Sequence, residues 1–148
     1  MNRLMNRLMT RPMNSLNTAL TVALTLFAAA PALAQQPLNQ NAHITETLVA
    51  GQVGDAIRKT CPSISAKMFV VLGKLTELED YARAQGYTEA EVKLFLKDPA
   101  EKARIKGLAA AYMKTAGIVD GDVESYCVAG RAEIAKATLI GSLLRSWK

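Results

Sequence analysis

Apolar residues recur every three or four positions along most of the chain, which is the period of an amphipathic helix. The clearest stripe lies in the middle of the sequence and comprises Met68, Val71, Leu72, Leu75, Leu78 and Ala82. The same spacing predicts helices over residues 42–59, 63–85 and 123–147, with two further helices between residues 88 and 117. No stretch alternates apolar and polar residues as a half-buried strand does. The pattern therefore predicts an all-α domain, a single small bundle of four to five helices.

Capping residues set the expected ends of these helices. Pro62 stops the first helix, Ser63 is a competent N-cap for the second, and Gly86 follows its end. The TEAE sequence at residues 88–91 is a capping box that opens the third helix. Residues 98–99 place an aspartate N-cap before a proline at the first position of the fourth helix. The caps and the apolar period thus predict the same boundaries.

The start of the chain has the three parts of an export signal. A basic region and an apolar stretch over residues 20–30 are followed by small residues at Ala32 and Ala34. The apolar stretch is shorter than the roughly 20 residues that span a bilayer. We therefore expect residues 1–34 to be a signal peptide cleaved after Ala34 and the protein to be periplasmic, with an uncleaved membrane anchor as the alternative. Residues 35–41 would be a frayed, polar N-terminal lead, and residues 42–148 the helical domain.

Removing that segment changes the charge of the protein. The whole chain has a net charge of +5, but three of its 18 Lys and Arg residues and none of its 13 acids lie before residue 35, which leaves +2. A charge so close to neutral gives no reason to expect nucleic-acid binding. One local imbalance remains, the basic stretch Lys93, Lys97, Lys102, Arg104 and Lys106. It is either a solvated helix face or a patch for weak contact with anionic lipid headgroups or an acidic partner.

The chain has two cysteines, Cys61 and Cys127, and both follow the export signal. An even number of cysteines in an oxidising compartment indicates a disulfide, which here would join the first helix to the last. The alternative is a thiol enzyme with Cys61 as its nucleophile, which needs a base to form the thiolate. The only histidine, His43, would lie about 27 Å from Cys61 along the same helix. We therefore favour a structural corner over a catalytic site.

No other motif indicates catalysis, a cofactor or a metal. The serine and lysine spacings around Cys61 do not match S-x-x-K, and G-x-S-x-G is absent. One histidine and two distant cysteines do not form a zinc site, and glycine-rich phosphate loops are absent. We predict that the protein is not an enzyme and that it uses no cofactor and no metal.

The last predicted helix carries the candidate interaction surface. Its small residues Gly130, Ala137 and Gly141 share roughly one side, which suits either core packing or docking of a partner. Its apolar end comprises Leu143, Leu144 and Trp147, and Trp is enriched among interface anchors. Arg131 lies between the small residues and would pair with an acid of another helix, for example Asp55.

Several segments resemble a small alphaproteobacterial family of exported proteins of unknown function. They are CPSISAKM, GYTEAEV, DPAEKARIKG and ESYCVAGRAEI with the later IGSLLR, and they span most of the mature chain. The resemblance implies that Cys61 and Cys127 are the two cysteines of the family, within its CPSIS and YC-x-x-GR-x-EI motifs. Some members are encoded among the genes for respiratory NADH dehydrogenase and carry the name of one of its subunits. Nothing in this chain resembles the iron–sulfur ligands of an electron-transfer subunit.

Three functional hypotheses follow. The leading one is a non-catalytic periplasmic protein that binds another envelope protein as an accessory factor of an envelope or respiratory complex. The second is a periplasmic holdase-type chaperone, which rests on analogy of fold alone. The third is a thiol-dependent enzyme, which requires Cys61 to be a free thiol.

Overall fold

The computed structural model describes residues 35–147, most of which lie in helices. In chain order its elements are the 3-10 turn η1 (Leu38–Gln40), α1 (Ala42–Thr60), β1 (Ile64–Ala66), α2 (Met68–Ala84), α3 (Glu89–Lys97), α4 (Pro99–Thr115), α5 (Val123–Ala135), α6 (Leu139–Ser142) and β2 (Leu144–Ser146). The predicted all-α fold class is confirmed, with one two-stranded antiparallel ribbon added. The predicted signal peptide lies outside the described residues.

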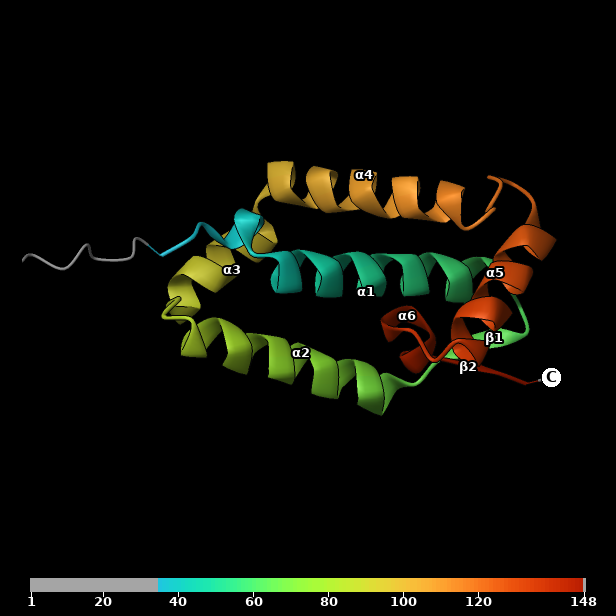
Figure 1. The fold of residues 1–148 in the computed structure, drawn as a ribbon, viewed down its shortest axis with the longest axis horizontal. Helices are drawn as coiled ribbons and strands as arrows, with labels where there is room; N and C mark the ends of the chain where they lie inside the picture. The colour runs from blue at the N-terminus through green and yellow to red at the C-terminus, as the bar shows by residue number, and fades with distance from the viewer. Residues whose placement is uncertain (1–34, 148) are drawn as a thin grey trace, which may run out of the picture. The chain divides into compact units, whose positions relative to one another are not determined.

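The first helix, α1, is the centre of the domain (Figure 1). In this view α4 runs along one side of α1 and α2 along the other. Helix α3 joins α2 to α4 near the beginning of α1, whereas α5, α6 and the β-ribbon gather near its end. The main core lies at that second end, around Val53 and Ile57, which are fully buried. A smaller core around Ile44, Leu78 and Tyr87 holds the first end.

The N-terminal lead is packed against the domain, so the expectation that it is frayed was wrong. The hydroxyl of Tyr87 donates to the carbonyl of Gln36 at 2.5 Å, and Leu38 packs on the smaller core. Asn41 then caps α1, where its side chain accepts from the backbone of Ile44 at 3.2 Å. An N-cap with a buried partner fixes where the helix begins. The lead is therefore part of the folded unit.

The start of the second helix also differs from the prediction. Ser63 does not cap it, because the chain first forms β1, and α2 begins only at Met68. The pairing of β1 with β2 sets Ser65 opposite Arg145. The side chain of Lys67, at the N-cap position of α2, makes no capping hydrogen bond. The first turn of α2 thus lacks the local stabilisation that a serine cap would supply.

The predicted helix over residues 123–147 is divided into three elements, α5, α6 and β2. Helix α5 ends in a Schellman motif, in which the amide of Thr138 donates to the carbonyl of Glu133 and the amide of Ala137 to that of Ile134. Ala137 takes a left-handed conformation, with φ at 51°. Thr138 then caps α6 by accepting from the amide of Gly141 at 3.0 Å. These local hydrogen bonds outweigh the helical period of the apolar residues and turn the chain back.

The remaining predicted boundaries agree with the structure. The capping box between Thr88 and Glu91 is present, and the side chain of Asp98 caps α4 ahead of Pro99. Gly86 follows α2 in a left-handed conformation, with φ at 90°. These ends depend on residues within one turn of each other, which is why the sequence reveals them.

Candidate interaction surface

The two cysteines form the predicted disulfide. Cys61 follows α1 directly and is bonded to Cys127 of α5, with a sulfur–sulfur distance of 2.08 Å. Both residues are almost fully buried, and the Oγ atom of Ser63 lies 3.2 Å from the sulfur of Cys61. The bond thus ties the end of α1 and the start of the ribbon to α5. A nucleophilic thiol at Cys61 would first require reduction of this bond.

The four residues proposed as an interaction surface do not lie together at the surface. Leu143 and Leu144 are buried, so they belong to the core and offer no surface to a partner. Arg131 is exposed and pairs with Glu124 of its own helix at 2.6 Å, and not with Asp55. Trp147 remains exposed, and the guanidinium carbon of Arg145 lies 4.5 Å from its ring centre. Of the four residues, Arg131 and Trp147 are therefore accessible, and the two leucines between them in the sequence are not.

Gly130 and Gly141 of the last segment pack inside the domain, which confirms the core-packing alternative for these two residues, whereas Ala137 is exposed. A Cβ atom on Gly130 would lie 2.5 Å from the side chain of Ile64 and 2.7 Å from that of Ile57. A Cβ atom on Gly141 would lie 2.0 Å from the carbonyl oxygen of Glu133. The absence of side chains at these two positions lets α5 approach the β-ribbon and lets α6 fold back on α5.

Among the described residues, exposed large apolar side chains follow one another most closely in the first half of α2. The sequence predicted one buried stripe on this helix, but only Leu78 and Ala82 of that stripe are buried. Phe69 is 93% exposed, which is the fully solvated state of a large aromatic side chain. Its large apolar neighbours Met68, Val70, Leu72 and Leu75 are also exposed. Contiguous apolar side chains of this kind indicate an interaction site.

A shallow groove runs between this half of α2 and α1. Met68 and Val71 form one wall, and the α1 side includes Gly51 and Gly54. A Cβ atom on Gly51 would contact nothing within 4 Å, so α1 leaves open space there. The hollow has a volume of about 120 Å³. Helix α2 is consequently held at its C-terminal half and only loosely covered at its N-terminal half.

The segments that form this surface carry more positive than negative charge. The basic residues on the end of α1, the first half of α2 and β2 are Arg58, Lys59, Lys67, Lys74 and Arg145. The acids there are Asp55, which binds both Arg58 and Lys59, and Glu77, which binds Lys74. Among the described residues, no salt bridge neutralises Lys67 or Arg145. Basic residues therefore outnumber acidic ones around the apolar side chains. We call these apolar side chains of residues 68–75, together with the basic residues around them, the α2 surface.

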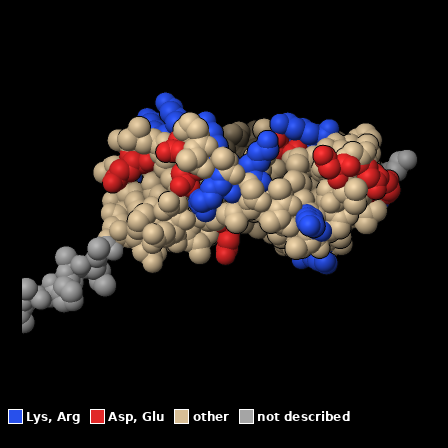
Figure 2. All heavy atoms as spheres, turned by 90° about the horizontal axis from the view of Figure 1, so that it is seen from above, with Lys and Arg blue, Asp and Glu red and all other residues tan. Residues whose placement is uncertain are grey.

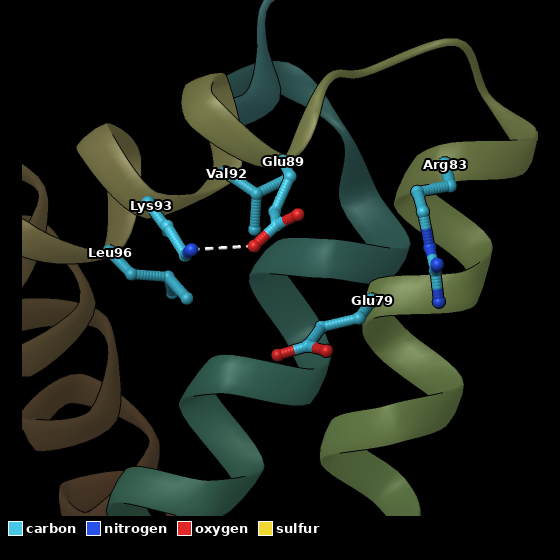
Figure 3. A pocket seen from close by; sticks show the side chains of 6 residues that line it. All are labelled: Glu79, Arg83, Glu89, Val92, Lys93 and Leu96. Atoms are coloured by element: carbon cyan, nitrogen blue, oxygen red, sulfur yellow. Dashed lines mark ion pairs between the residues drawn. The ribbon is translucent and has the colours of Figure 1, made fainter.

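A second hollow, between α2 and α3, is lined by charges of both signs (Figure 3). It has a volume of about 310 Å³. Lys93 binds Glu89 at 2.5 Å across one turn of α3, while Glu79 and Arg83 project from α2. Most of these charges are exposed and have a partner of opposite sign nearby. The arrangement suits a solvated helix pair better than a binding site.

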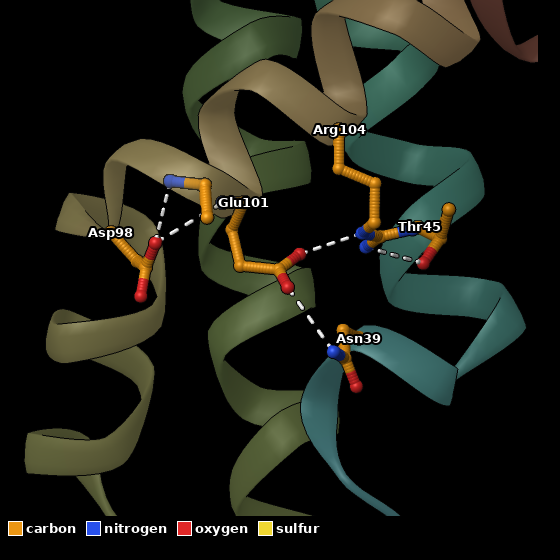
Figure 4. A network of polar contacts seen from close by, with 6 residues as sticks. Asn39, Thr45, Asp98, Glu101 and Arg104 are labelled. Carbon is orange, nitrogen blue, oxygen red and sulfur yellow. Dashed lines mark hydrogen bonds and ion pairs between the residues drawn. The ribbon is translucent and has the colours of Figure 1, made fainter.

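The basic stretch, predicted to be either a solvated helix face or a patch for anionic groups, is divided between α3 and α4. Lys93 binds Glu89, and Arg104 binds Glu101 at 2.7 Å. Arg104 also donates to Thr45 of α1 at 3.3 Å, and Asn39 donates to Glu101 at 3.1 Å (Figure 4). On the face that carries α4, positive and negative side chains are interspersed (Figure 2). Part of the stretch thus holds α4 and η1 to α1.

A buried carboxylate was not predicted. Glu133 of α5 is only 6% exposed. Its Oε1 atom accepts from the hydroxyl of Tyr112 of α4 at 2.7 Å, and its Oε2 atom accepts from the hydroxyl of Thr138. The hydrogen bond to Glu133, together with burial, raises the pKa of Tyr112 to about 12. Tyr112 therefore remains a phenol that links α4 to α5.

This raised pKa predicts a loss of stability in alkali. The phenol of an unfolded chain loses its proton near pH 10, whereas Tyr112 keeps it to about pH 12 in the folded protein. Between these values the unfolded state binds fewer protons, so the free energy of unfolding falls as the pH rises. The stability advantage of the wild type over Tyr112→Phe should be present below pH 10 and lost towards pH 12. Urea unfolding of both proteins across this range measures it.

The control for this prediction is the partner carboxylate. In Glu133→Gln the phenol should titrate nearer its usual pKa, which the near-ultraviolet absorbance of tyrosinate reports. An unchanged titration in Glu133→Gln would show that Glu133 does not hold the Tyr112 proton.

Within residues 35–147 no helix is both long and apolar enough to cross a bilayer. The same residues contain no cluster of three or more His, Cys, Asp or Glu side chains that could hold a metal ion.

Comparison with known proteins places the chain in a family. The profile of DUF5333, a family of unknown function, matches residues 36–145. The chain belongs to this family. A search of curated proteins and a search of solved structures each gave no match. The family match includes both cysteines, all of α2 and Glu133, whereas Trp147 lies outside it.

One of the two features that sequence analysis missed had a signal in the chain. Glu133 follows Tyr126 and Gly130 at helical spacing, and both of these residues are buried. A charged residue on a buried stripe indicates a carboxylate that needs hydrogen-bond donors inside the fold. The exposure of α2 had no such signal, because its apolar stripe looks like that of a packed helix.

Proposed function

We propose that the protein is a non-catalytic accessory factor of the cell envelope that binds another protein through the α2 surface. The observation that supports this most is the exposed apolar first half of α2. Several large apolar side chains left exposed on one half of a helix have a cost in water that a partner would remove. Phe69 is the natural anchor, because aromatic side chains dominate the binding energy of many interfaces.

The charges around the α2 surface favour an acidic partner. An amphipathic segment with apolar anchors on one face could lie against α2, in the manner of helix-in-groove recognition. Acidic residues at its edges would then meet Arg58, Lys67 and Arg145. Charge complementarity of this kind mainly speeds association and selects the partner.

The disulfide supports a location outside the cytoplasm, since such bonds persist in oxidising compartments. This agrees with the export signal predicted over residues 1–34 and with a periplasmic site of action. A connection to a respiratory complex rests on the family resemblance alone.

Site-specific cross-linking tests this proposal. A photoreactive amino acid replaces Phe69 in one variant and Leu94 of α3, which is 71% exposed, in the other. We expect one discrete cross-linked protein from membranes at position 69 and none at position 94. The cross-linked peptide of the partner should be acidic and amphipathic.

A pair of double variants provides the matched control. Phe69→Ser with Leu72→Ser should abolish copurification of that partner, whereas Leu94→Ser with Val119→Ser should retain it. Cross-linking at position 69 to many unrelated unfolded chains would contradict a single partner and favour the holdase alternative. Cross-linking to lipid alone would contradict a protein partner altogether.

A further inference from the structure

A groove between α1, α4 and the start of α6 is both apolar and acidic. Its volume of about 420 Å³ lies within the range of about 300–1,000 Å³ that small-molecule sites occupy. Its apolar walls come from three helices and include Val49, Leu108, Leu139 and Ile140. The exposed part of the lining is mostly carbon. A molecule that enters this groove would therefore exchange water for apolar contact over most of its length.

The polar part of the groove is organised by the buried Glu133. Tyr112 and Thr138 line the groove, and each hydroxyl donates to one carboxylate oxygen of Glu133 behind it. Both donors are neutral, so they satisfy the oxygen atoms without bringing a positive charge. Burial of a carboxylate without a cation is costly, and a nearby positive group would lower that cost.

No described residue that lines the groove is a lysine or an arginine. Glu46 of α1 is exposed at the rim and adds a second negative charge. Arg104 touches Thr45 at one end, but Glu101 binds its guanidinium at 2.7 Å. Glu46 at the rim and Glu133 behind the hydroxyls of Tyr112 and Thr138 therefore give this open apolar groove negative charge without a lysine or arginine in its lining.

We propose that this groove binds a small amphiphilic cation, a molecule with one amine or quaternary ammonium group on an apolar body. The apolar body lies against Leu108, Leu139 and Ile140. The positive group lies over the ring of Tyr112, which attracts cations, and within the field of Glu133. An anion of the same shape is repelled, and a neutral molecule gains only the apolar contact. This site is independent of the α2 surface, because none of its lining belongs to α2.

Three probes with the same eight-carbon chain test the charge preference directly. They are octyltrimethylammonium, 1-octanol and octanoate, each titrated into the purified, disulfide-bonded protein below the concentration at which it forms micelles. Backbone amide chemical shifts report both the site and the dissociation constant. We expect octyltrimethylammonium to bind about tenfold more tightly than 1-octanol, equivalent to about 1.4 kcal/mol. Octanoate should bind most weakly, and the shifts should centre on Val49, Leu139 and Ile140.

Two variants separate charge from shape. Glu133→Gln is close in shape, and we expect the preference for the cation over 1-octanol to shrink while 1-octanol still binds. Leu108→Lys adds an amine at a half-exposed wall residue and should abolish binding of the cation. Leu94→Lys makes the same change on α3, away from the groove, and should leave the three affinities unchanged. Circular dichroism and thermal unfolding confirm that each variant is folded.

The outcomes are distinct. Equal affinity for the three probes would show an apolar groove without charge selection and overturn the proposal. Shifts centred on α2 would assign the binding to another surface and overturn it as well. If Glu133→Gln does not fold, the two lysine variants still test the site. Loss of the cation preference in Leu108→Lys, with the preference kept in Leu94→Lys, would support it. Retention of cation binding in Leu108→Lys would contradict it.

Discussion

Replacing Cys61 and Cys127 together with alanine should lower the free energy of unfolding by about 4 kcal/mol. The disulfide joins residues 66 positions apart, so it removes much of the conformational freedom of the unfolded chain. Both cysteines are almost fully buried, so the loss of their two sulfur atoms adds a small cavity cost to the loss of the bond. Against a typical stability of about 5–15 kcal/mol, such a loss would leave a marginal domain.

Urea unfolding of the double variant measures this loss. The wild type treated with a thiol reductant is the second sample, and its midpoint should move in the same direction. Intact mass after alkylation of the untreated wild type should show neither cysteine modified. A stability change below about 1 kcal/mol would mean that the unfolded chain is already constrained without the bond.

Loss of the disulfide should also weaken the α2 surface. Cys61 directly precedes the ribbon, and α2 follows that ribbon without a side-chain cap. The start of α2 thus depends on the ribbon for its position. We expect amide exchange in the first turns of α2 to accelerate in the double variant more than exchange in α4 does.

Gly141→Ala should destabilise the protein by roughly 3 kcal/mol, the upper part of the range for overpacking. The new Cβ atom would lie 2.0 Å from the carbonyl oxygen of Glu133, 2.4 Å from its carbonyl carbon and 2.7 Å from the amide nitrogen of Ile134. All three atoms belong to the backbone of α5, so no change of rotamer relieves the clash. Either α6 moves away from α5 or the turn between them opens.

Gly51→Ala is the matched control. This glycine lies in α1, and a Cβ atom there would contact nothing within 4 Å. Alanine should therefore raise the stability by about 0.5–1 kcal/mol through its better helix propensity. Thermal and urea unfolding of the two variants should give effects of opposite sign. A change of less than 1 kcal/mol in Gly141→Ala would contradict the close approach of α6 to α5.

Much of the predicted interaction surface was inferred from the helical period of apolar residues, which does not report burial. Leu143 and Leu144 attracted attention as an apolar end of a long helix, but they fill the core because the chain turns back at Ala137. Leu72 and Leu75 were assigned to the apolar stripe of a packed helix and are exposed. Helical periodicity indicates that one face of a helix is apolar, but it does not indicate whether another element covers that face.

The amino-acid sequence by itself determined the helical class, most helix ends and the cysteine pairing. Each of these follows from short-range chemistry or from simple counting. The capping box at Thr88 involves residues within one helical turn, and two cysteines allow only one intramolecular pair.

The tertiary structure alone decided which apolar residues remain in water and which side chains satisfy the buried acid. Helix α1 presents Gly51 and Gly54 towards the first half of α2, so α2 finds too few side chains there to cover its apolar face. Glu133 is buried because Tyr112, twenty-one positions away, and Thr138 both donate to its carboxylate. The exposure of α2 and the hydrogen bonds of Glu133 both depend on contacts between side chains of different helices. A local sequence pattern does not report such contacts.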